Sequence, residues 1–319
     1  KIRILSDMAI EFSIIIPTYK RFEELILTLP QVVAQMQNNY ELIIIEQSDL
    51  AEVQANKEKL ETQLEGINYT LLHSAVPSVP LAWNTGCDKA QGRILIYLDD
   101  DVDFTFDIVA AHIAYYNDPT VVGVAGCYYA SSVEHEWIPS SKNGIAGSLS
   151  GANMSFLKSS FEKIGAASSF LKPFAAVDWE LCEAMNSVGK VVVGYDTTVL
   201  HRAPASGGCA NQGFRGEEWY FGAYHNHTVW MLSRSFPQLF TNLPRHFYWL
   251  FKYCLPKKKT DMFTFSFFKN AIYNGIKAGW KTHVENGRQR KTWVLPETSM
   301  TLIASGKASK AKPKIKLDD

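Results

Sequence analysis

The sequence feature that most constrains the fold is a short apolar run followed at once by three carboxylates. Ile94 to Leu98 follows Gly92 and is too short for a comfortable helix, so it predicts a strand buried on both faces. Asp99, Asp100 and Asp101 come directly after it. Charged side chains this close repel one another, and burial would raise their pKa values. A bound divalent cation would remove the repulsion, because oxygen ligands suit Mg²⁺ and Mn²⁺, whereas a solvated acidic turn is the alternative interpretation.

Strand-like and helix-like segments alternate over the first hundred residues. Apolar β-branched runs predict buried strands, and 3.6-residue periodicity predicts helices between them. This alternation is typical of a parallel α/β sheet with right-handed crossovers, whose ligands lie at the carboxyl ends of the strands. The expected strands are 11–16, 42–45, 67–72 and 94–98, and the expected helices are 22–36, 51–64 and 79–90.

The second half of the chain is less regular. Two glycine-rich segments, 144–151 and 203–215, predict mobile loops. Gly-x-Gly-x-x-Gly, Walker A and His-Glu-x-x-His motifs are absent from the sequence, which argues against dinucleotide, P-loop and zinc-protease functions. The further expected elements are helices at 106–116 and 175–188 and strands at 121–129 and 191–193.

The net charge of zero hides two parts of opposite charge. Residues 1–241 hold 16 Lys and Arg against 27 Asp and Glu, a net charge of −11, whereas residues 242–319 hold 16 against 5, or +11. The basic part is rich in aromatic residues, and charges interrupt its apolar runs. It therefore predicts helices that lie on an anionic membrane surface rather than across it, although packing on the rest of the protein is the alternative. No RNP, KH or zinc motif supports nucleic-acid binding.

Cysteine usage and hydropathy bear on the compartment. The five cysteines are scattered, odd in number and form no Cys-x-x-Cys pair, which favours a reducing compartment over a disulfide framework. Residues 1–10 lack a signal-peptide apolar stretch, and no run of eighteen uncharged apolar residues predicts a transmembrane helix. We therefore expect a cytoplasmic protein that is peripheral on the inner face of the cell membrane.

Seven short blocks carry polar or small residues in a fixed order between residues 11 and 235. Together they resemble the family 2 glycosyltransferases, a large inverting family with the GT-A nucleotide-sugar fold, in the order and spacing of the family's motifs. One Asp triplet alone would be a weak signal, but seven ordered blocks are a specific one. The blocks are Ile14-Ile15-Ile16-Pro17-Thr18-Tyr19-Lys20-Arg21, Glu46-Gln47-Ser48-Asp49, Ala82-Trp83-Asn84-Thr85-Gly86, Leu98-Asp99-Asp100-Asp101, Gly151-Ala152-Asn153-Met154, Asp178-Trp179-Glu180-Leu181 and His201.

The resemblance implies a GT-A catalytic domain over residues 11–235, which is a Rossmann-like, mostly parallel sheet flanked by helices. A basic, aromatic-rich helical extension over 236–300 would follow, with the membrane-contacting helices in it. Residues 301–319 are rich in Lys, and we expect them to form a disordered tail.

The resemblance also assigns roles to individual residues. Asp178 would be the catalytic base, and Asp101 and His201 would bind Mn²⁺ or Mg²⁺. Asn153, Trp179 and Glu180 are expected on the acceptor side. Nucleotide-sugar binding would fall to Pro17, Thr18, Tyr19, Arg21, Glu46, Asn84, Asp99 and Asp100.

Several of these residues have simpler explanations when each is taken alone. Glu46 would also suit a helix cap, and Asp178 and Glu180 would suit the first turn of any helix. A single His is more often structural than a metal ligand, Asn84 would also shape a helix end, and Trp179 would also fill a core.

The sequence departs from the family pattern in three places. Glu46 stands where the family usually has Asp, which changes the base or ribose contact by one methylene. Val177 precedes Asp178, where the family often has Glu. The Gln-x-x-Arg-Trp signature of processive polysaccharide synthases is missing, which predicts the transfer of single sugars.

These observations predict a metal-dependent inverting glycosyltransferase that acts in surface polysaccharide or glycan assembly. It would move one sugar from a nucleoside-diphosphate sugar to a saccharide acceptor, free or lipid-linked. A catalytically silent nucleotide-sugar-binding or scaffold protein is the alternative. A sugar nucleotidyltransferase is disfavoured, because residues 17–21 contain no glycine.

Overall fold

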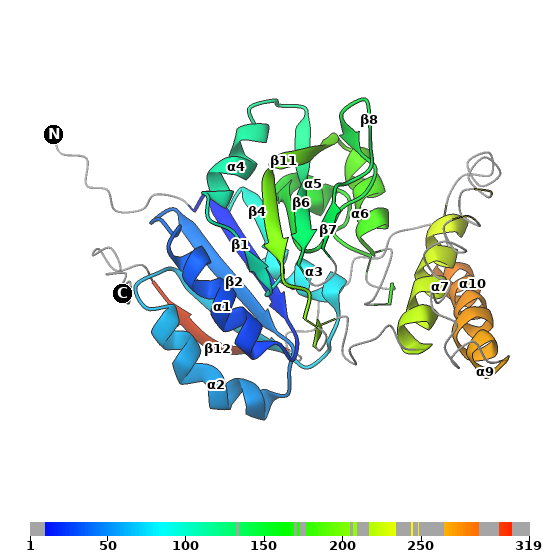
Figure 1. The fold of residues 1–319 in the computed structure, drawn as a ribbon, viewed down its shortest axis with the longest axis horizontal. Coiled ribbons are helices and arrows are strands. Elements are labelled where there is room, and N and C mark those ends of the chain that lie inside the picture. The colour runs from blue at the N-terminus through cyan, green and yellow to red at the C-terminus, as the bar shows by residue number, and fades with distance from the viewer. Residues whose placement is uncertain are drawn as a thin grey trace.

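The computed structural model shows an α/β protein built around one mixed sheet, with a pair of helices at one end (Figure 1). This confirms the predicted α/β class. The residues that the structure describes are 10–131, 134–168, 171–172, 177–204, 207–208, 217–233, 244, 248, 265–286 and 300–307.

The first half of the chain forms the parallel part of the sheet, as its sequence pattern predicts. β1 lies between β2 and β4, with Phe12 opposite both Tyr40 and Ile94, so the three carboxyl ends meet at one edge. Helices connect these strands as crossovers. The strands are β1 (Phe12–Thr18), β2 (Tyr40–Glu46), β3 (Tyr69–Ser74) and β4 (Ile94–Leu98), and the helices are α1 (Phe22–Val33), α2 (Leu50–Gln63) and α3 (Val79–Lys89).

The second half extends the sheet beyond β4 with a change of direction. β10 (Asn153–Leu157) runs antiparallel to both β4 and β6 (Val121–Ala130). β11 (Lys190–His201) then runs parallel to β6, with two irregularities in register. The predicted strand 191–193 is therefore only the start of β11, because residues beyond the second irregularity resume pairing with β6. The helices here are α4 (Ile108–Tyr115), α5 (Lys158–Lys163) and α6 (Val177–Asn186).

Four short strands complete this half. β5 (Val102–Asp103) pairs with the end of β11, which places His201 opposite Val102. β7 (His135–Trp137) pairs with β6, and β8 (Ser141–Lys142) with β9 (Ile145–Ala146). Because β9 also pairs with β11, the expected mobile loop 144–151 begins within the sheet.

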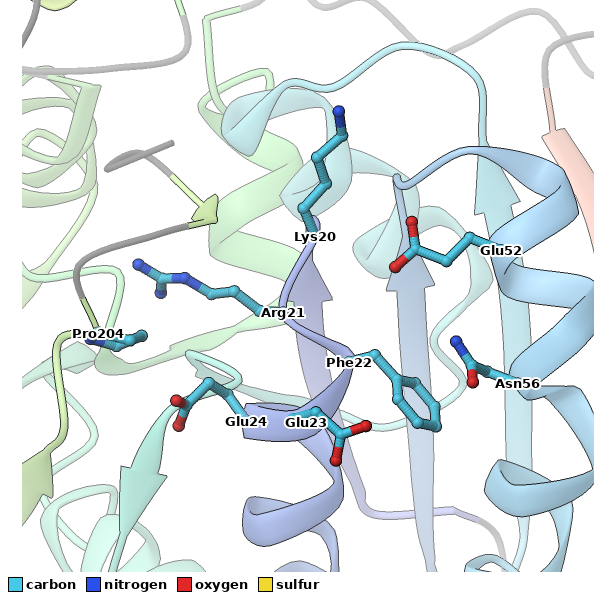
Figure 2. Close-up of a pocket in the computed structure, with 8 residues that line it drawn as sticks. All are labelled: Lys20, Arg21, Phe22, Glu23, Glu24, Glu52, Asn56 and Pro204. Carbon is cyan, nitrogen blue, oxygen red and sulfur yellow. The ribbon is translucent and has the colours of Figure 1, made fainter. Parts of the chain in front are cut away.

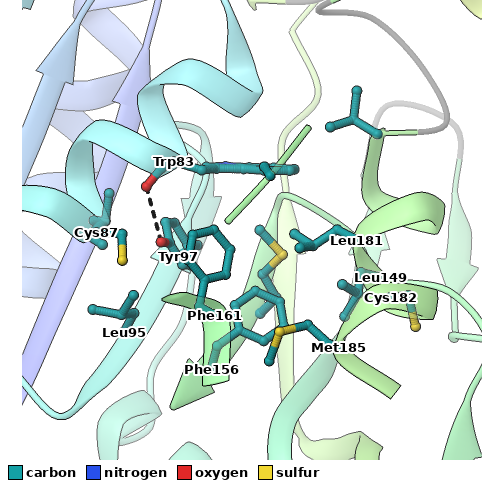
Figure 3. Close-up of a cluster of buried hydrophobic side chains, with 14 of the residues drawn as sticks. Trp83, Cys87, Leu95, Tyr97, Leu149, Phe156, Phe161, Leu181, Cys182 and Met185 are labelled. Carbon is teal, nitrogen blue, oxygen red and sulfur yellow. Dashed lines mark hydrogen bonds between the residues drawn. The ribbon is translucent and has the colours of Figure 1, made fainter. Parts of the chain in front are cut away.

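The sheet is buried on both faces, because alternate residues of each strand point to opposite sides. In β1, Ile15 joins one hydrophobic cluster and Ile14 the other. The first cluster receives side chains from α3, α5 and α6, and the second from α1, α2 and α4. In the first, the Tyr97 hydroxyl donates to the Trp83 carbonyl at 3.1 Å (Figure 3). These two layers fix the strand ends that carry the polar residues.

Helices after β11 form a smaller packed group. α7 (Glu217–Leu232) contacts α10 (Asn274–Asn286) along its length, and α9 (Phe265–Phe267) with η2 (Phe268–Tyr273), a π-helical segment, precedes α10. Figure 1 shows α7 and α10 side by side. Most of the predicted extension over 236–300 lies outside the described residues.

The expectation of a disordered tail over 301–319 is wrong for its first residues. β12 (Met300–Gly306) pairs antiparallel with β3 and forms the edge of the sheet, while residues 308–319 lie outside the described part. The boundary at residue 235 therefore does not enclose the whole sheet. The sheet runs in the order β12-β3-β2-β1-β4-β10-β6-β11-β9-β8, with β5 and β7 off this path.

Candidate active site

Three carboxylates and a histidine from distant parts of the chain meet at the carboxyl edge of the sheet. Asp99, Asp100 and Asp101 follow β4, and His201 ends β11. The pairing of β5 with β11 brings the two segments together. His201 Nε2 lies 3.0 Å from Asp101 Oδ1 and 3.9 Å from Asp99 Oδ2.

Asp99, Asp101 and His201 each offer one atom that could ligate a metal ion, and these three atoms all lie within 4.8 Å of one another. Asp101 Oδ1 is buried, and the contact that it makes with His201 Nε2 at 3.0 Å is an ion pair only when the imidazole is protonated. A buried carboxylate is costly unless its charge is compensated. Two carboxylates and an imidazole on one point thus fit a divalent cation such as Mn²⁺.

Arg21 supplies positive charge to the same carboxylates. Its Nη1 lies 2.8 Å from Asp101 Oδ2 and 3.4 Å from Asp100 Oδ1. The backbone of Gly207 and Gly208 passes so close to the Arg21 side chain that a Cβ on either glycine would collide with it, and Gly208 N donates to Tyr19 O at 2.8 Å. Both glycines have positive φ, which makes this close approach possible.

The electrostatics of Asp99, Asp100 and Asp101, called the triad from here on, match this arrangement. Burial and the charge of Asp101 raise the pKa of Asp99 to about 6 and that of Asp100 to about 8. Burial alone would raise the pKa of Asp101, but His201 and Arg21 outweigh burial and lower it. Asp101 is therefore the carboxylate of the three that ionises most readily.

Arg202 holds the backbone beneath the triad. Its amide N–H donates to the Asp101 carbonyl at 2.9 Å. Its guanidinium donates to Glu24 Oε2 at 2.7 Å, the Glu24 carbonyl at 2.9 Å, Thr28 Oγ1 at 2.9 Å and a carboxylate oxygen of Asp103. Thr28 Oγ1 in turn donates to the Asp100 carbonyl at 2.8 Å. Sequence reasoning missed this role, and the only signal for it is that Arg202 follows His201.

The loop after β1 is held in a strained conformation next to the triad. Pro17 and Thr18 are buried, and Tyr19 is half-buried. Lys20 has a backbone φ of 55°, which residues other than glycine rarely adopt. Its amide N–H donates to Ser48 Oγ at 2.7 Å, so the end of β2 stabilises this loop.

The residues predicted to contact the nucleotide line this same edge. Glu46 is buried at the end of β2, where its Oε1 accepts from Ser48 N at 2.8 Å. Burial raises the pKa of Glu46, although hydrogen bonds from Ser48 oppose the shift. His73 Nε2 lies 2.8 Å from the Ser48 carbonyl. Residues from β1, β2 and β3 thus form one continuous polar edge.

An open pocket of about 340 Å³ lies beside this edge (Figure 2). Arg21, which lines it, also contacts Asp100 and Asp101, and Glu52 and Asn56 of α2 line it as well. Its lining residues are Lys20, Arg21, Phe22, Glu23, Glu24, Glu52, Asn56 and Pro204.

Asp178, the predicted base, lies in the first turn of α6. Its Oδ1 accepts from Trp179 N at 3.1 Å. Burial raises the pKa of Asp178 to about 6, and the charge of Asp99 adds to the shift. Asp178 is thus close enough to the triad to interact electrostatically with it.

The structure does not place four other predicted residues in the carboxylate cluster. Asn84 binds the backbone of Ala167 through both amide atoms, at 2.9 and 2.8 Å. Asn153 is fully buried, with its Oδ1 2.8 Å from His112 Nε2.

The other two are neighbours of Asp178. Trp179 packs on Trp230, with ring centroids 5.9 Å apart, and Glu180 accepts from Ser168 Oγ at 3.0 Å. These contacts join the two residues to α7 and to the segment that ends at Ser168.

Comparison with known proteins identifies the class. The profile described as "Glycosyl transferase family 2" matches residues 13–174, half of the chain, so the chain belongs to this family. This confirms the resemblance read from the seven blocks. No curated protein sequence matches the chain significantly.

Solved structures of glycosyltransferases share the GT-A fold of the chain. The mannosyltransferase PcManGT from Pyrobaculum calidifontis, in complex with GDP-Man and Mn²⁺, is 14% identical with a TM-score of 0.54 over 86% of this chain and 74% of that one. GalNAc-T7 with UDP, GalNAc and Mn²⁺ is 13% identical with a TM-score of 0.58 over 89% and 59%. TarS 1–349 from S. aureus is 13% identical with a TM-score of 0.54 over 87% and 89%.

Proposed function

We propose that the chain is a metal-dependent inverting glycosyltransferase that moves one sugar from a nucleoside-diphosphate sugar to a saccharide acceptor. The observation that carries the proposal is the convergence of Asp99, Asp101 and His201 at the carboxyl edge of a GT-A sheet. The bound ligands of two similar structures, GDP-Man with Mn²⁺ and UDP with Mn²⁺, support it.

Asp101 and His201, with Asp99, would hold Mn²⁺ or Mg²⁺. When bound, the ion would neutralise charge on the departing diphosphate. Arg21 would release its contacts with Asp100 and Asp101 and turn its positive charge to the same diphosphate. Buried Glu46 would contact the base or ribose, together with the loop of Pro17, Thr18 and Tyr19.

Asp178 would accept the proton of the acceptor hydroxyl as that oxygen attacks the anomeric carbon from the face opposite the leaving group. A pKa of about 6 leaves the carboxylate ionised at neutral pH, while making it a stronger base than an exposed Asp. Trp179 and Glu180 follow Asp178 on α6, and we propose that they lie on the acceptor side of the site.

We further propose that the acceptor is a saccharide, free or lipid-linked, in surface polysaccharide or glycan assembly. The enzyme would work in the cytoplasm at the inner face of the membrane. Among the described residues, no helix is long and apolar enough to cross a bilayer. The excess of Lys and Arg in residues 242–319 supports contact with an anionic surface.

Calorimetric titration with UDP, GDP and dTDP, each with Mn²⁺ and with EDTA, tests the proposal. We expect one nucleotide to bind tightly only with Mn²⁺, and Asp101→Ala to abolish that binding. Asp196→Ala, which removes an exposed carboxylate on β11, is the matched control and should bind like the native chain. Failure of all three nucleotides to bind the folded protein would favour the silent scaffold instead.

A further inference from the structure

The side of α10 that faces α7 is defined by small residues. A Cβ on Gly275 would lie 2.7 Å from the Phe221 carbonyl oxygen, and Gly279 approaches the backbone of His225 even more closely. One turn further, Thr282 Oγ1 lies 2.8 Å from His225 Nε2. This side of α10 therefore faces α7 closely, and a larger residue at either glycine would push the helices apart.

The opposite side of the same helix is apolar and exposed. Tyr273, the last residue of η2, and Ile276, Trp280 and Val284 of α10 recur at intervals of three and four residues, so they form one stripe. Their exposed fractions are 55, 41, 60 and 65%. We call these four residues the outer stripe of α10. Apolar residues gathered in one exposed stripe are typical of an interaction site, whereas singly scattered ones are not.

Positive charge accompanies the outer stripe. Lys269, Lys277 and Lys281 are exposed on the same segment. Within residues 265–286 the one acidic residue is Glu285, which lies 3.6 Å from Lys281. A Trp and a Tyr among aliphatic residues, flanked by lysines, suit a boundary between lipid chains and anionic headgroups.

We propose that the outer stripe of α10 docks the protein on an anionic membrane surface, with the helix lying in the interface plane. The stripe gives a defined surface to the membrane location proposed above and rests on that part of the proposed function. A protein partner would not need lysines on the stripe's borders, whereas anionic headgroups pair with them.

The docking helix connects to the candidate active site through α7. Trp230 of α7 donates from Nε1 to Glu183 Oε2 at 2.7 Å and packs on Trp179, and both partners belong to α6, which begins beside Asp178. Asn226 binds both backbone groups of Lys172 at 2.7 Å. The membrane-facing helix α10 packs on α7, and α7 in turn contacts α6, the helix that carries the proposed base, which suits an acceptor presented from the membrane.

Co-sedimentation of the full chain with vesicles tests the proposal. We expect binding to vesicles of phosphatidylcholine with 30% phosphatidylglycerol, little binding to phosphatidylcholine alone, and loss of binding with rising salt. The double variant Trp280→Ser, Val284→Ser should lose at least tenfold in affinity. Lys277→Gln with Lys281→Gln should lose about 25-fold, because each lysine near such a surface contributes about a factor of five.

Leu27→Ser is the matched control, because Leu27 of α1 is an apolar residue of similar exposure, 58%, away from α10. It should bind vesicles like the native chain. Equal vesicle binding by the stripe variants, or no binding by the native chain, would overturn the proposal. A dimer detected by light scattering in the native chain but not in Trp280→Ser, Val284→Ser would assign the stripe to a second copy instead. Nucleotide titration of the same samples separates these failures from failure of the proposed transferase activity.

Discussion

Replacing Arg202 by Lys tests whether the carboxylate cluster depends on residues that never touch a ligand. The guanidinium of Arg202 joins α1, through Glu24 and Thr28, to Asp103 of β5. Its fork of fixed donors makes these contacts at once, whereas a lysine ammonium on a flexible stem makes only some of them. The charge is kept in Arg202→Lys, so the variant isolates the geometry.

The expected loss of stability follows from partial burial. The Arg202 side chain is 18% exposed, and those of Glu24 and Asp103 are 24 and 31% exposed. Exposed ion pairs contribute about 0–1 kcal/mol, and breaking a fully buried pair costs about 3–5 kcal/mol. Because the charge remains, we expect a loss of about 1–2 kcal/mol in the free energy of unfolding, or roughly 4 °C in Tm.

We also expect Arg202→Lys to lose affinity for the metal ion. Asp101 and the backbone N–H of residue 202 would remain, but the guanidinium also donates to Thr28 Oγ1 and to the Asp100 carbonyl, and Thr28 Oγ1 itself donates to that carbonyl. Replacing a residue that orients metal ligands typically costs about 10–100-fold in metal affinity. Arg202→Lys should therefore weaken Mn²⁺ binding by about that factor while the protein stays folded.

Titration of Mn²⁺, followed by the electron paramagnetic resonance signal of the free ion, measures this directly. Arg93→Lys is the matched control. Arg93 forms an exposed ion pair with Glu11 at 3.7 Å, and this pair includes none of the carboxylates Asp99, Asp100 and Asp101. It should change Tm by less than about 2 °C and leave Mn²⁺ affinity unchanged. If Arg202→Lys binds Mn²⁺ within twofold of the native chain, Arg202 does not position the cluster.

Two further predictions concern the base and the helix pair. Asp178→Asn should keep nucleotide binding while turnover falls about 10²–10⁴-fold, and native turnover should rise through about pH 6 as Asp178 ionises, as a pH–rate profile would detect. Turnover of Asp178→Asn at close to the native rate would remove Asp178 from the mechanism. Gly279→Val should separate α10 from α7 and lower Tm, whereas Ala278→Val, on a half-buried neighbouring position, should not. Equal melting of the two variants would contradict the close packing.

The sequence predicts the parallel half of the fold and the carboxylates of the site for a simple physical reason. A strand such as Ile94–Leu98, buried on both faces, must be apolar throughout, and the polarity of Asp99 then marks its end. In a parallel sheet all such ends lie at one edge, so residues that follow β1, β2 and β4 meet without any knowledge of tertiary contacts.

The contacts of His201 and Arg202 had no comparable local signal. They depend on a two-residue strand, β5, pairing with the end of β11 across about a hundred residues of chain. A two-residue strand has no periodicity, and the register of β11 shifts twice before it reaches His201. The sequence therefore shows that a His is present after the last strand, but not that its neighbour holds the triad in place.

β12 shows how composition misleads when it is averaged over a segment. Residues 301–319 are rich in Lys as a whole, yet Met300 to Ala304 contains only uncharged residues and pairs with β3 from Ser74 to Leu71. Without β12, β3 would leave a row of unpaired backbone groups along the edge of a sheet, which invites pairing with other chains. Covering that edge needs only a short uncharged segment that can pair with it. β12 therefore pairs with the otherwise exposed edge of β3, and the average composition of residues 301–319 does not show this.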